Sequence, residues 1–525
     1  MRKVRPAVAL VGVATIIRLI LAAVIPLFPD ETYYWEWSRH LAAGYFDHPP
    51  ALALLIRAGT TVFGATAIGV RIGAVLAGLV ASFAIIVMSW RLADSATGET
   101  VQDARSSFST SELLADQGSR AALLLLAIPA ALVGFVIATP DAPLLAAIAL
   151  TLAALERAIA SQPRSADSFG WWCAAGIALG IAFCSKYTSV LIPLGVFIAL
   201  LSRKDLRARL AEPGPYAATL IALLVLAPTL VWNSHNGWIS FTFQLHHGLG
   251  QVRGSVLGRE LALVAGQLGL ISPILAVLAI IAVARALRSY ADPRRFMLAV
   301  VATTIVAFFA VSAIRRPVEP NWPIPALVAA LPLLATISLK ARWRRWFVGG
   351  AVLGALCIVL VAAQATARII HVTARRDPIA RAHGWSDLAR AVQTAESRTS
   401  GCSVTWIAAD RYQDASELAF NMRGNPRVFS LNLGGRANQY DLWPKIYSVA
   451  AASDCALVVV DQGTQGETVV KRIGATSASL IGNAVMTWRG SAVGRRAIWL
   501  VRGIPDSPLV EVELSAAEQS ALSAT

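Results

Sequence analysis

Long apolar runs separated by short polar segments fill roughly the first 370 residues of the chain. A helix needs about 20 apolar residues to cross the bilayer core, and short helices are tolerated where neighbours bury their ends. The pattern therefore predicts a polytopic α-helical membrane protein with about eleven transmembrane helices. The expected spans are residues 7–27, 67–90, 121–138, 142–155, 171–184, 189–201, 217–232, 261–284, 296–314, 322–339 and 347–369.

The pattern changes after residue 370, where short β-rich runs alternate with helical ones. Strands are expected at residues 404–409, 427–431, 456–460 and 497–502, with a helix at 415–422. This alternation predicts a small α/β domain with a largely parallel sheet. No glycine-rich phosphate loop follows any of these strands, so nothing supports nucleotide binding there. We expect a transmembrane domain over residues 1–370 and an α/β domain over 371–525.

Composition agrees with a membrane protein and indicates its orientation. Hydrophobic residues make up 56% of the 525-residue chain and charged residues 15%, which is too apolar for a soluble globule. Most of the basic residues behind the net charge of +15 lie in short clusters between apolar runs. This is the positive-inside pattern rather than a nucleic-acid-binding stripe. Eleven spans place the first polar loop and the α/β domain on the same outer side.

The first outer loop, residues 28–66, holds the densest group of candidate catalytic side chains. Asp30 and Glu31 follow the first span directly, and Asp47 lies further along the same loop. We expect these three acids to be catalytic, with Tyr33 and His48 binding substrate. An interfacial aromatic belt with a few solvated charges is the alternative. Residues 51–63, later in the loop, predict an interfacial helix.

Other outer connections carry isolated polar groups. Lys186, between two apolar runs, needs a helix end or an anionic partner, and a phosphate is one such partner. The alternative is a lysine that snorkels to the headgroups, and the arginine pair 315–316 has a similar alternative as a topological flank of its helix. The candidate substrate-binding residues in these connections are Asp141, Lys186, Arg315, Arg316, Glu319 and Asn321.

Several motifs together resemble a known family. They are PDETYYWEWSRHLAAGYFDHPP, TPDAPL, GIALGIAFCSKYTSVLIPLG, NGWISFTFQLHHG and VEPNWPIPAL. In this order they resemble the bacterial branch of the protein O-mannosyltransferase-like membrane glycosyltransferases, which is glycosyltransferase family 39 within the C-type fold. The lipid A aminoarabinose transferases are similar relatives. The resemblance covers residues 10–340 and continues weakly into RYQDASELAF and NQYDLWP of the α/β domain.

The resemblance implies an enzyme of the bacterial inner membrane whose active site and α/β domain face the periplasm. It implies a polyprenyl-phosphate sugar donor and a glycolipid such as lipid A or lipopolysaccharide, or a protein, as acceptor. Asp30 matches the family's candidate base, Asp47 and Asp141 match further acidic positions, and Lys186 matches a basic residue near the lipid phosphate. The lumenal β-trefoil module of the eukaryotic enzymes is missing, which weakens the expectation of a protein acceptor.

Chemistry supports the same assignment. Displacing a prenyl phosphate needs a carboxylate to take the acceptor proton and cations to hold the departing phosphate. A second carboxylate could raise the pKa of the base or bind a divalent cation; no metal ligands are assigned, and the need for a metal stays open. A transporter or lipid flippase is the alternative function, although no internal repeat supports it. The sugar and the acceptor stay open.

Two of the five cysteines could pair. Cys402 and Cys455 each lie just before a predicted strand. If those strands are parallel neighbours in register, their starts lie about 5 Å apart, within the range of roughly 4.4–6.8 Å for a disulfide. An oxidising periplasm would let the bond persist, and two buried thiols are the alternative. Cys173, Cys184 and Cys357 lie in expected spans and should stay reduced.

Overall fold

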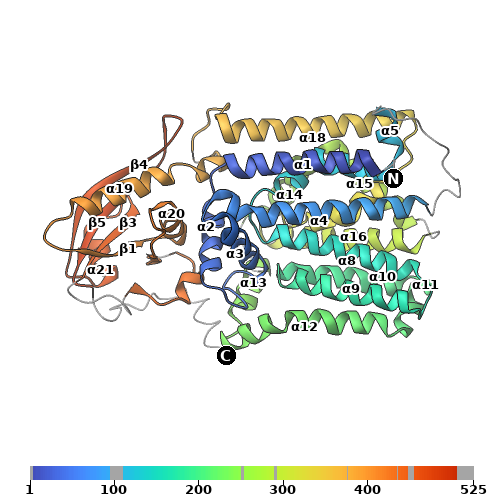
Figure 1. The fold of residues 1–525 in the computed structure, drawn as a ribbon, viewed down its shortest axis with the longest axis horizontal. Helices are drawn as coiled ribbons and strands as arrows, with labels where there is room; N and C mark the ends of the chain where they lie inside the picture. The colour runs from blue at the N-terminus through green and yellow to red at the C-terminus, as the bar shows by residue number, and fades with distance from the viewer. Residues whose placement is uncertain are drawn as a thin grey trace.

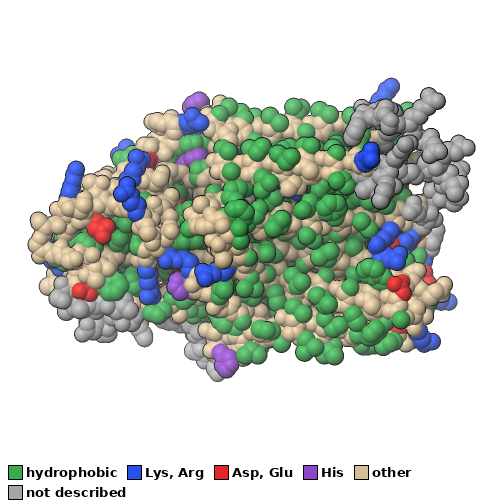
Figure 2. All heavy atoms as spheres, viewed as in Figure 1, with side chains coloured by type: hydrophobic (Ala, Val, Ile, Leu, Met, Phe, Trp, Pro, Cys, Tyr) green, Lys and Arg blue, Asp and Glu red, His purple; other side chains and the backbone are tan. Residues whose placement is uncertain are grey.

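The structure is a computed structural model. It describes residues 4–94, 110–249, 254–288, 292–374, 376–433, 435–446 and 454–504. A bundle of long helices forms one end of the molecule and a small α/β domain forms the other, with short helices between them (Figure 1). Figure 2 shows hydrophobic side chains over the flank of the bundle and charged side chains gathered near its two ends. This surface fits a bilayer, whose core accommodates apolar side chains and not charges.

Seven described helices are long and apolar enough to cross a membrane. Each overlaps most of one expected span. They are α1 (Val4–Val24), α4 (Ala67–Asp94), α8 (Asp141–Ala160), α9 (Ala166–Phe183), α12 (Gly214–His235), α16 (Pro293–Arg315) and α18 (Ala341–Ala367).

One expected span, residues 261–284, is two helices. Helix α14 (Val256–Ile271) and helix α15 (Pro273–Arg288) meet at a bend of 99°. Ser272 between them has a φ of 82°, and Pro273 cannot donate the backbone hydrogen bond that would continue the helix. The apolar run was therefore predicted correctly, but its straight path was not. If the bent pair counts as one span, the described part of the chain has eight.

The remaining expected spans are shorter or interrupted, so the count of about eleven is not reached by full-length helices. Residues 121–138 form α6 (Gln117–Ala127) and α7 (Pro129–Val133), separated where Ile128 is extended before a proline. Residues 189–201 fall in the 3-10 helix η1 (Tyr187–Val190) and in α10 (Leu191–Ser202). Residues 322–339 hold only α17 (Pro325–Ala335), which is buried along its whole length. Short helices α5 (Thr110–Ala115), α11 (Lys204–Arg207) and η2 (Ala208–Ala211) complete this part.

The first polar loop is more regular than a connecting loop. It contains α2 (Pro29–Arg39) and α3 (Ala51–Phe63), and the second of these matches the helix expected at residues 51–63. Proline at the first position and two acids in the first turn favour the start of α2, because they suit the unpaired N–H groups and the helix dipole. Helices α2, α3 and α13 (Ile239–Leu249) lie between the bundle and the α/β domain (Figure 1).

The C-terminal domain has a five-stranded sheet in the order β2-β1-β3-β5-β4. Strands β1 (Val404–Ala409), β2 (Val428–Ser430) and β3 (Cys455–Asp461) are parallel, as expected. Its helices are α19 (Trp385–Arg398), α20 (Tyr412–Asn421) and α21 (Gly466–Ile473), with 3-10 turns η3 (Pro378–Ala382) and η4 (Gln439–Asp441). Helix α20 corresponds to the predicted helix at residues 415–422.

The prediction of a largely parallel sheet is wrong for the last two strands. Strands β4 (Ser477–Trp488) and β5 (Ser491–Arg502) form an antiparallel hairpin, and β5 also pairs antiparallel with β3. The two residues of the turn, Arg489 and Gly490, both have positive φ values of 49° and 77°, as tight hairpin turns require. Strand β4 was missed. Only three of its twelve side chains are buried, and Leu480, Ile481 and Val485 are exposed, so its apolar residues do not follow one buried face.

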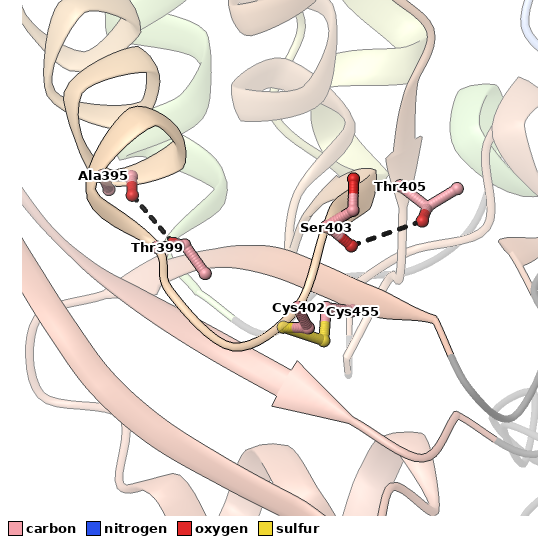
Figure 3. The surroundings of a disulfide bond; sticks show 6 residues. All are labelled: Ala395, Thr399, Cys402, Ser403, Thr405 and Cys455. Carbon is pink, nitrogen blue, oxygen red and sulfur yellow. Dashed lines mark hydrogen bonds between the residues drawn. A yellow bond between two sulfur atoms is a disulfide. The ribbon is translucent and has the colours of Figure 1, made fainter.

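The expected cystine is present. Cys402 and Cys455 are bonded with a Cα–Cα distance of 6.3 Å (Figure 3). The pairing of β1 with β3 begins at Val404 and Cys455, which are register partners, so the strand starts lie side by side as predicted. The bond ties the segment that follows α19 to the first residue of β3, while Cys173, Cys184 and Cys357 stay free.

Candidate active site

Glu31 anchors helix α2 to the bundle. Its side chain is fully buried and accepts hydrogen bonds from two nitrogens of Arg71 on α4, at 2.7 and 2.5 Å. The backbone nitrogens of Phe28 and Ala138 donate to the same carboxylate at 3.0 and 2.8 Å. Four protein donors surround the buried carboxylate, so its geometry favours a structural role for Glu31 over the expected catalytic one. These contacts fix the start of α2 against the bundle.

Asp30 is the neighbouring acid and lies on the other side of the helix start. It is partly buried, and the described residues offer its carboxylate neither a hydrogen bond nor an ion pair. Burial raises the pKa of Asp30, while Arg381 and Arg436 act in the opposite direction and Glu31 adds to the rise. A reachable carboxylate with a raised pKa suits a general base better than one held by four donors.

Asp47 connects the first loop with the C-terminal domain. The Tyr33 hydroxyl donates a hydrogen bond to the Asp47 carboxylate at 2.7 Å, and Arg436 forms an ion pair with the same carboxylate at 3.1 Å. Burial raises the pKa of Asp47, against the lowering effects of Arg436 and of the Tyr33 hydroxyl. The Tyr33 hydroxyl also accepts a hydrogen bond from the backbone nitrogen of Gln439 at 2.7 Å. Asp47 and Tyr33 therefore hold the first loop and the C-terminal domain together.

The α/β domain supplies site residues that were not among the sequence candidates. Arg436, in the segment between β2 and η4, stands over the rings of Phe243 and Tyr412 at 5.1 and 5.8 Å. The ring of Tyr412 packs against Tyr33 with centroids 4.5 Å apart. Gln439 accepts a hydrogen bond from the Phe46 backbone nitrogen at 2.7 Å.

A sequence signal for these residues existed. Tyr412 lies within RYQDASELAF and Gln439 within NQYDLWP, the two segments of the domain that continue the family resemblance, and Arg436 precedes the second by two positions. Nothing in the sequence, however, indicated that these segments meet the first loop, because about 400 residues separate them from it.

A second polar cluster forms at the start of α8. Lys186 donates to Asp141 at 2.7 Å, and Asn321 donates to the other oxygen of the same carboxylate at 2.5 Å. The structure thus brings together three sequence candidates from three separate connections. The side chains of Lys186 and Asp141 are 11% and 13% exposed, so both can still be reached from solvent. The backbone links the cluster to the first loop, since the Ala51 nitrogen donates to the Cys184 carbonyl at 2.9 Å.

The other sequence candidates lie at the same end of the bundle but outside these two clusters. Arg315 ends α16 and is exposed, and Arg316 caps that helix and is partly buried. Glu319 is exposed on the segment that leads to Asn321. His48 packs 6.2 Å from Tyr34 and 6.5 Å from Trp37, measured between ring centroids. Substrate binding by these four side chains stays a prediction.

Over the described ranges of the chain, no three His, Cys, Asp or Glu side chains are grouped as a metal site would require. The acids of the first loop are instead matched with arginines: Glu31 with Arg71 and Asp47 with Arg436. Proton transfer by Asp30 and anion binding by cations are thus the chemistry that these side chains can supply.

Fold and site together define a polytopic membrane protein of the C-type glycosyltransferase fold, with carboxylates and cations at one end of its helix bundle. Comparison with known proteins confirms the resemblance inferred from the motifs. Residues 108–232 match the family model described as dolichyl-phosphate-mannose-protein mannosyltransferase. The lipid A galacturonosyltransferase RgtD of Rhizobium johnstonii is 28% identical over 323 residues, 60% of this chain and 61% of that protein. The chain thus spans about three fifths of the length of this relative.

Solved structures show the same fold. ArnT from Cupriavidus metallidurans in the apo state superposes with a TM-score of 0.63 at 19% identity, covering 94% of this chain and 97% of that one. ArnT bound to undecaprenyl phosphate gives the same TM-score at 18% identity, with the same coverage. The superposition includes the α/β domain as well as the bundle, because it covers nearly the whole of both chains.

Proposed function

We propose that the protein is an integral-membrane glycosyltransferase that moves a sugar from a polyprenyl phosphate to a glycolipid of the lipid A or lipopolysaccharide type. The observation that carries the proposal is the position of Asp30. It is an acid without an ion-pair partner among the described residues, at the same end of the bundle as the Lys186 cluster. The similarity to a lipid A transferase and the undecaprenyl phosphate bound by ArnT support the same donor and acceptor classes. The relatives are transferases, so transport is not favoured.

In the proposed mechanism Asp30 takes the proton of the acceptor nucleophile as it attacks the anomeric carbon. The sugar–phosphate bond breaks, and the phosphate of the prenyl carrier departs with the bonding electrons. Lys186 stabilises that charge, because a charge-assisted hydrogen bond to phosphate is among the stronger polar contacts. Asp141 and Asn321 orient the lysine in the absence of donor. Asp47, held by Tyr33 and Arg436, keeps the α/β domain against the first loop.

The proposed location is the bacterial inner membrane with Asp30 and the α/β domain in the periplasm. Basic clusters at the opposite end of the bundle support this orientation by the positive-inside rule. The eukaryotic type of protein acceptor is less favoured, because the α/β domain stands where those enzymes carry a different module.

The first test replaces Asp30 by Asn. Mass spectrometry of envelope glycolipids from cells with and without the gene identifies the product, and initial rates are then measured in membranes with that acceptor. We expect the Asp30→Asn rate to fall by about 10²–10⁴-fold, the usual contribution of a positioned general base, with thermal unfolding unchanged. Glu467→Gln, an exposed acid on α21, is the matched control. Near-normal turnover by Asp30→Asn would remove Asp30 from the mechanism.

A further inference from the structure

A large cavity opens at the end of the bundle opposite the α/β domain. Its volume is about 770 Å³, and it lies where the C-terminal ends of α8, α15 and α17 meet the N-terminal end of α16. Alanine, leucine and isoleucine side chains line one part of it, such as Ile159, Ala282 and Leu333. The polar part of the lining consists of Arg285, Asp292, Arg294, Arg295, Thr336 and Ser338. Ligand pockets in proteins usually measure about 300–1,000 Å³, so this volume suits a small molecule or a headgroup.

Two of the arginines are fixed by carboxylates. Arg294 donates to Asp292 and to the buried Glu156, at 3.0 and 2.7 Å. Arg295 lies 3.7 Å from the same aspartate and donates to the Thr336 hydroxyl at 2.9 Å. These contacts hold the guanidinium groups at the wall of the cavity without filling it.

Among the described residues around the cavity, the cations outnumber the acids. Arg91 also contacts Glu156, at 3.5 Å, so Asp292 and Glu156 together face Arg91, Arg294 and Arg295. Arg285 adds a fourth guanidinium with no carboxylate partner among the residues that the structure describes. It stands over the ring of Trp343 at 5.2 Å, which orients the group and leaves its N–H donors available. The described residues therefore give the cavity an excess of positive charge next to an apolar wall.

We propose that this cavity binds a phosphate-bearing anion, with Arg285 as its main contact. Arginine presents a planar set of donors that matches phosphate oxygens, and basic pockets between membrane helices bind anionic lipid headgroups. The apolar wall suits the glycerol and first acyl carbons of a phospholipid. A free phosphate ester has the same chemistry, and the experiment separates the two sources. This site lies at the far end of the bundle from Asp30 and does not depend on the proposed transfer reaction.

The test measures which phosphate-bearing molecules the protein retains. The purified protein is placed in nanodiscs of phosphatidylcholine with one-fifth phosphatidylglycerol. Native mass spectrometry then releases the protein from the nanodisc and identifies the lipid that stays bound to it. In parallel, glycerol 3-phosphate and inorganic phosphate are titrated into the detergent-solubilised protein, with thermal unfolding as the readout. We expect Arg285→Ala to lower retention or affinity about fivefold, the ratio for about 1 kcal/mol per basic residue near an anionic surface.

Two further variants separate a cavity from general surface charge. Arg345→Ala removes an exposed cation at the same end of the bundle that does not line the cavity, and it should retain ligand normally. Ser338→Trp fills the cavity without changing charge and should reduce retention. Bound phosphatidylglycerol alone identifies a lipid site, and a shift with glycerol 3-phosphate identifies a free phosphate ester. The proposal is overturned if the normal protein retains neither, if Arg345→Ala loses as much as Arg285→Ala, or if Ser338→Trp has no effect.

Discussion

The adjacent carboxylates of Asp30 and Glu31 differ in their burial and in their hydrogen-bond donors. Glu31 is surrounded by four donors and completely buried, and such a group is a structural anchor. Asp30 has no hydrogen-bond donor among the described residues, and its pKa is raised. Because successive helix positions point about 100° apart, one acid faces the bundle while its neighbour points away from that contact.

The pH dependence of transfer tests the electrostatics around Asp30. Arg436 lowers the pKa of Asp30 and of Asp47, so replacing it by Gln should raise both values. A general base works only when ionised, and the acidic limb of the kcat/KM profile should therefore move to higher pH. Arg398→Gln, an exposed arginine at the end of α19, serves as the control and should leave the profile in place. An unmoved acidic limb in Arg436→Gln would separate Arg436 from the base.

Helix α2 is the element that connects the two halves of the protein. On one side it is held to α4 by the Glu31–Arg71 pair. On the other side it packs on α20, where the Thr32 and Ser416 hydroxyls lie 3.1 Å apart and the rings of Trp35 and Phe420 meet edge to face at 5.0 Å. The position of Asp30 therefore depends on contacts with both the bundle and the α/β domain.

Removing Arg71 should release α2 from the bundle. Both side chains of the pair are 0% exposed, and Arg71 also donates to the carbonyls of Ala22, Ile25 and Pro26. Breaking a buried pair from one side typically costs about 3–5 kcal/mol, because the remaining charge stays buried and unpaired. Arg71→Met should therefore unfold at a lower temperature in detergent. The double variant Arg71→Met/Glu31→Gln should recover part of that stability, because it leaves no charge buried. Equal stability of Arg71→Met and the normal protein would contradict the anchoring role.

The disulfide between Cys402 and Cys455 fixes the start of strand β3 to the segment before β1. Thiol labelling of denatured, unreduced protein should modify Cys173, Cys184 and Cys357 only, and labelling after reduction should modify all five cysteines. The bond closes a loop of 53 residues, for which the chain-entropy model gives about 4 kcal/mol of stabilisation. Reduction should therefore lower the unfolding midpoint of the α/β domain. Five reactive cysteines before reduction would show that the bond does not form in solution.

In the whole molecule, the two sets of candidate functional side chains lie at opposite ends of the bundle. Asp30, Asp47 and the Lys186 cluster lie at the end that carries the α/β domain, and the arginine-lined cavity lies at the other end. Between them the flank of the bundle is hydrophobic (Figure 2). A bilayer around that flank would place the two ends in different compartments, which is what transfer on one side of a membrane requires.

Accessibility to a membrane-impermeant thiol reagent tests the proposed orientation. Glu467→Cys on α21 and Arg342→Cys at the start of α18 lie at opposite ends and are both exposed. Both variants are made in a protein that lacks the three free cysteines. In cells whose outer membrane is permeabilised and whose inner membrane is intact, the reagent should label position 467 and not position 342. Lysed cells should label both, which controls for reactivity. Labelling of position 342 in intact cells would reverse the orientation.

The sequence alone determined the elements whose signal is local. Hydropathy located the seven long spans, the residue pattern located α3 and the strands β1 and β3, and the strand starts led to the Cys402–Cys455 bond. Asp141, Lys186 and Asn321 were also recognised singly. Each element was located from a window of about 20 residues or fewer, and within such a window the physical preference of the chain is strong. The bond needed one further assumption, that the two strands are parallel neighbours.

Tertiary structure decided how those elements and side chains combine. Glu31 and Arg71 are 40 positions apart, Lys186 and Asp141 are 45 apart, and Asn321 and Asp141 are 180 apart. Arg436 reaches Asp47 from the other domain. The charge of a side chain gives no information on which distant partner folding will bring to it, because that depends on the packing of all the helices between them. For the same reason the sequence placed Asp30 and Glu31 together among three candidate catalytic acids, while the fold buries Glu31 against Arg71 and leaves Asp30 without an ion-pair partner among the described residues.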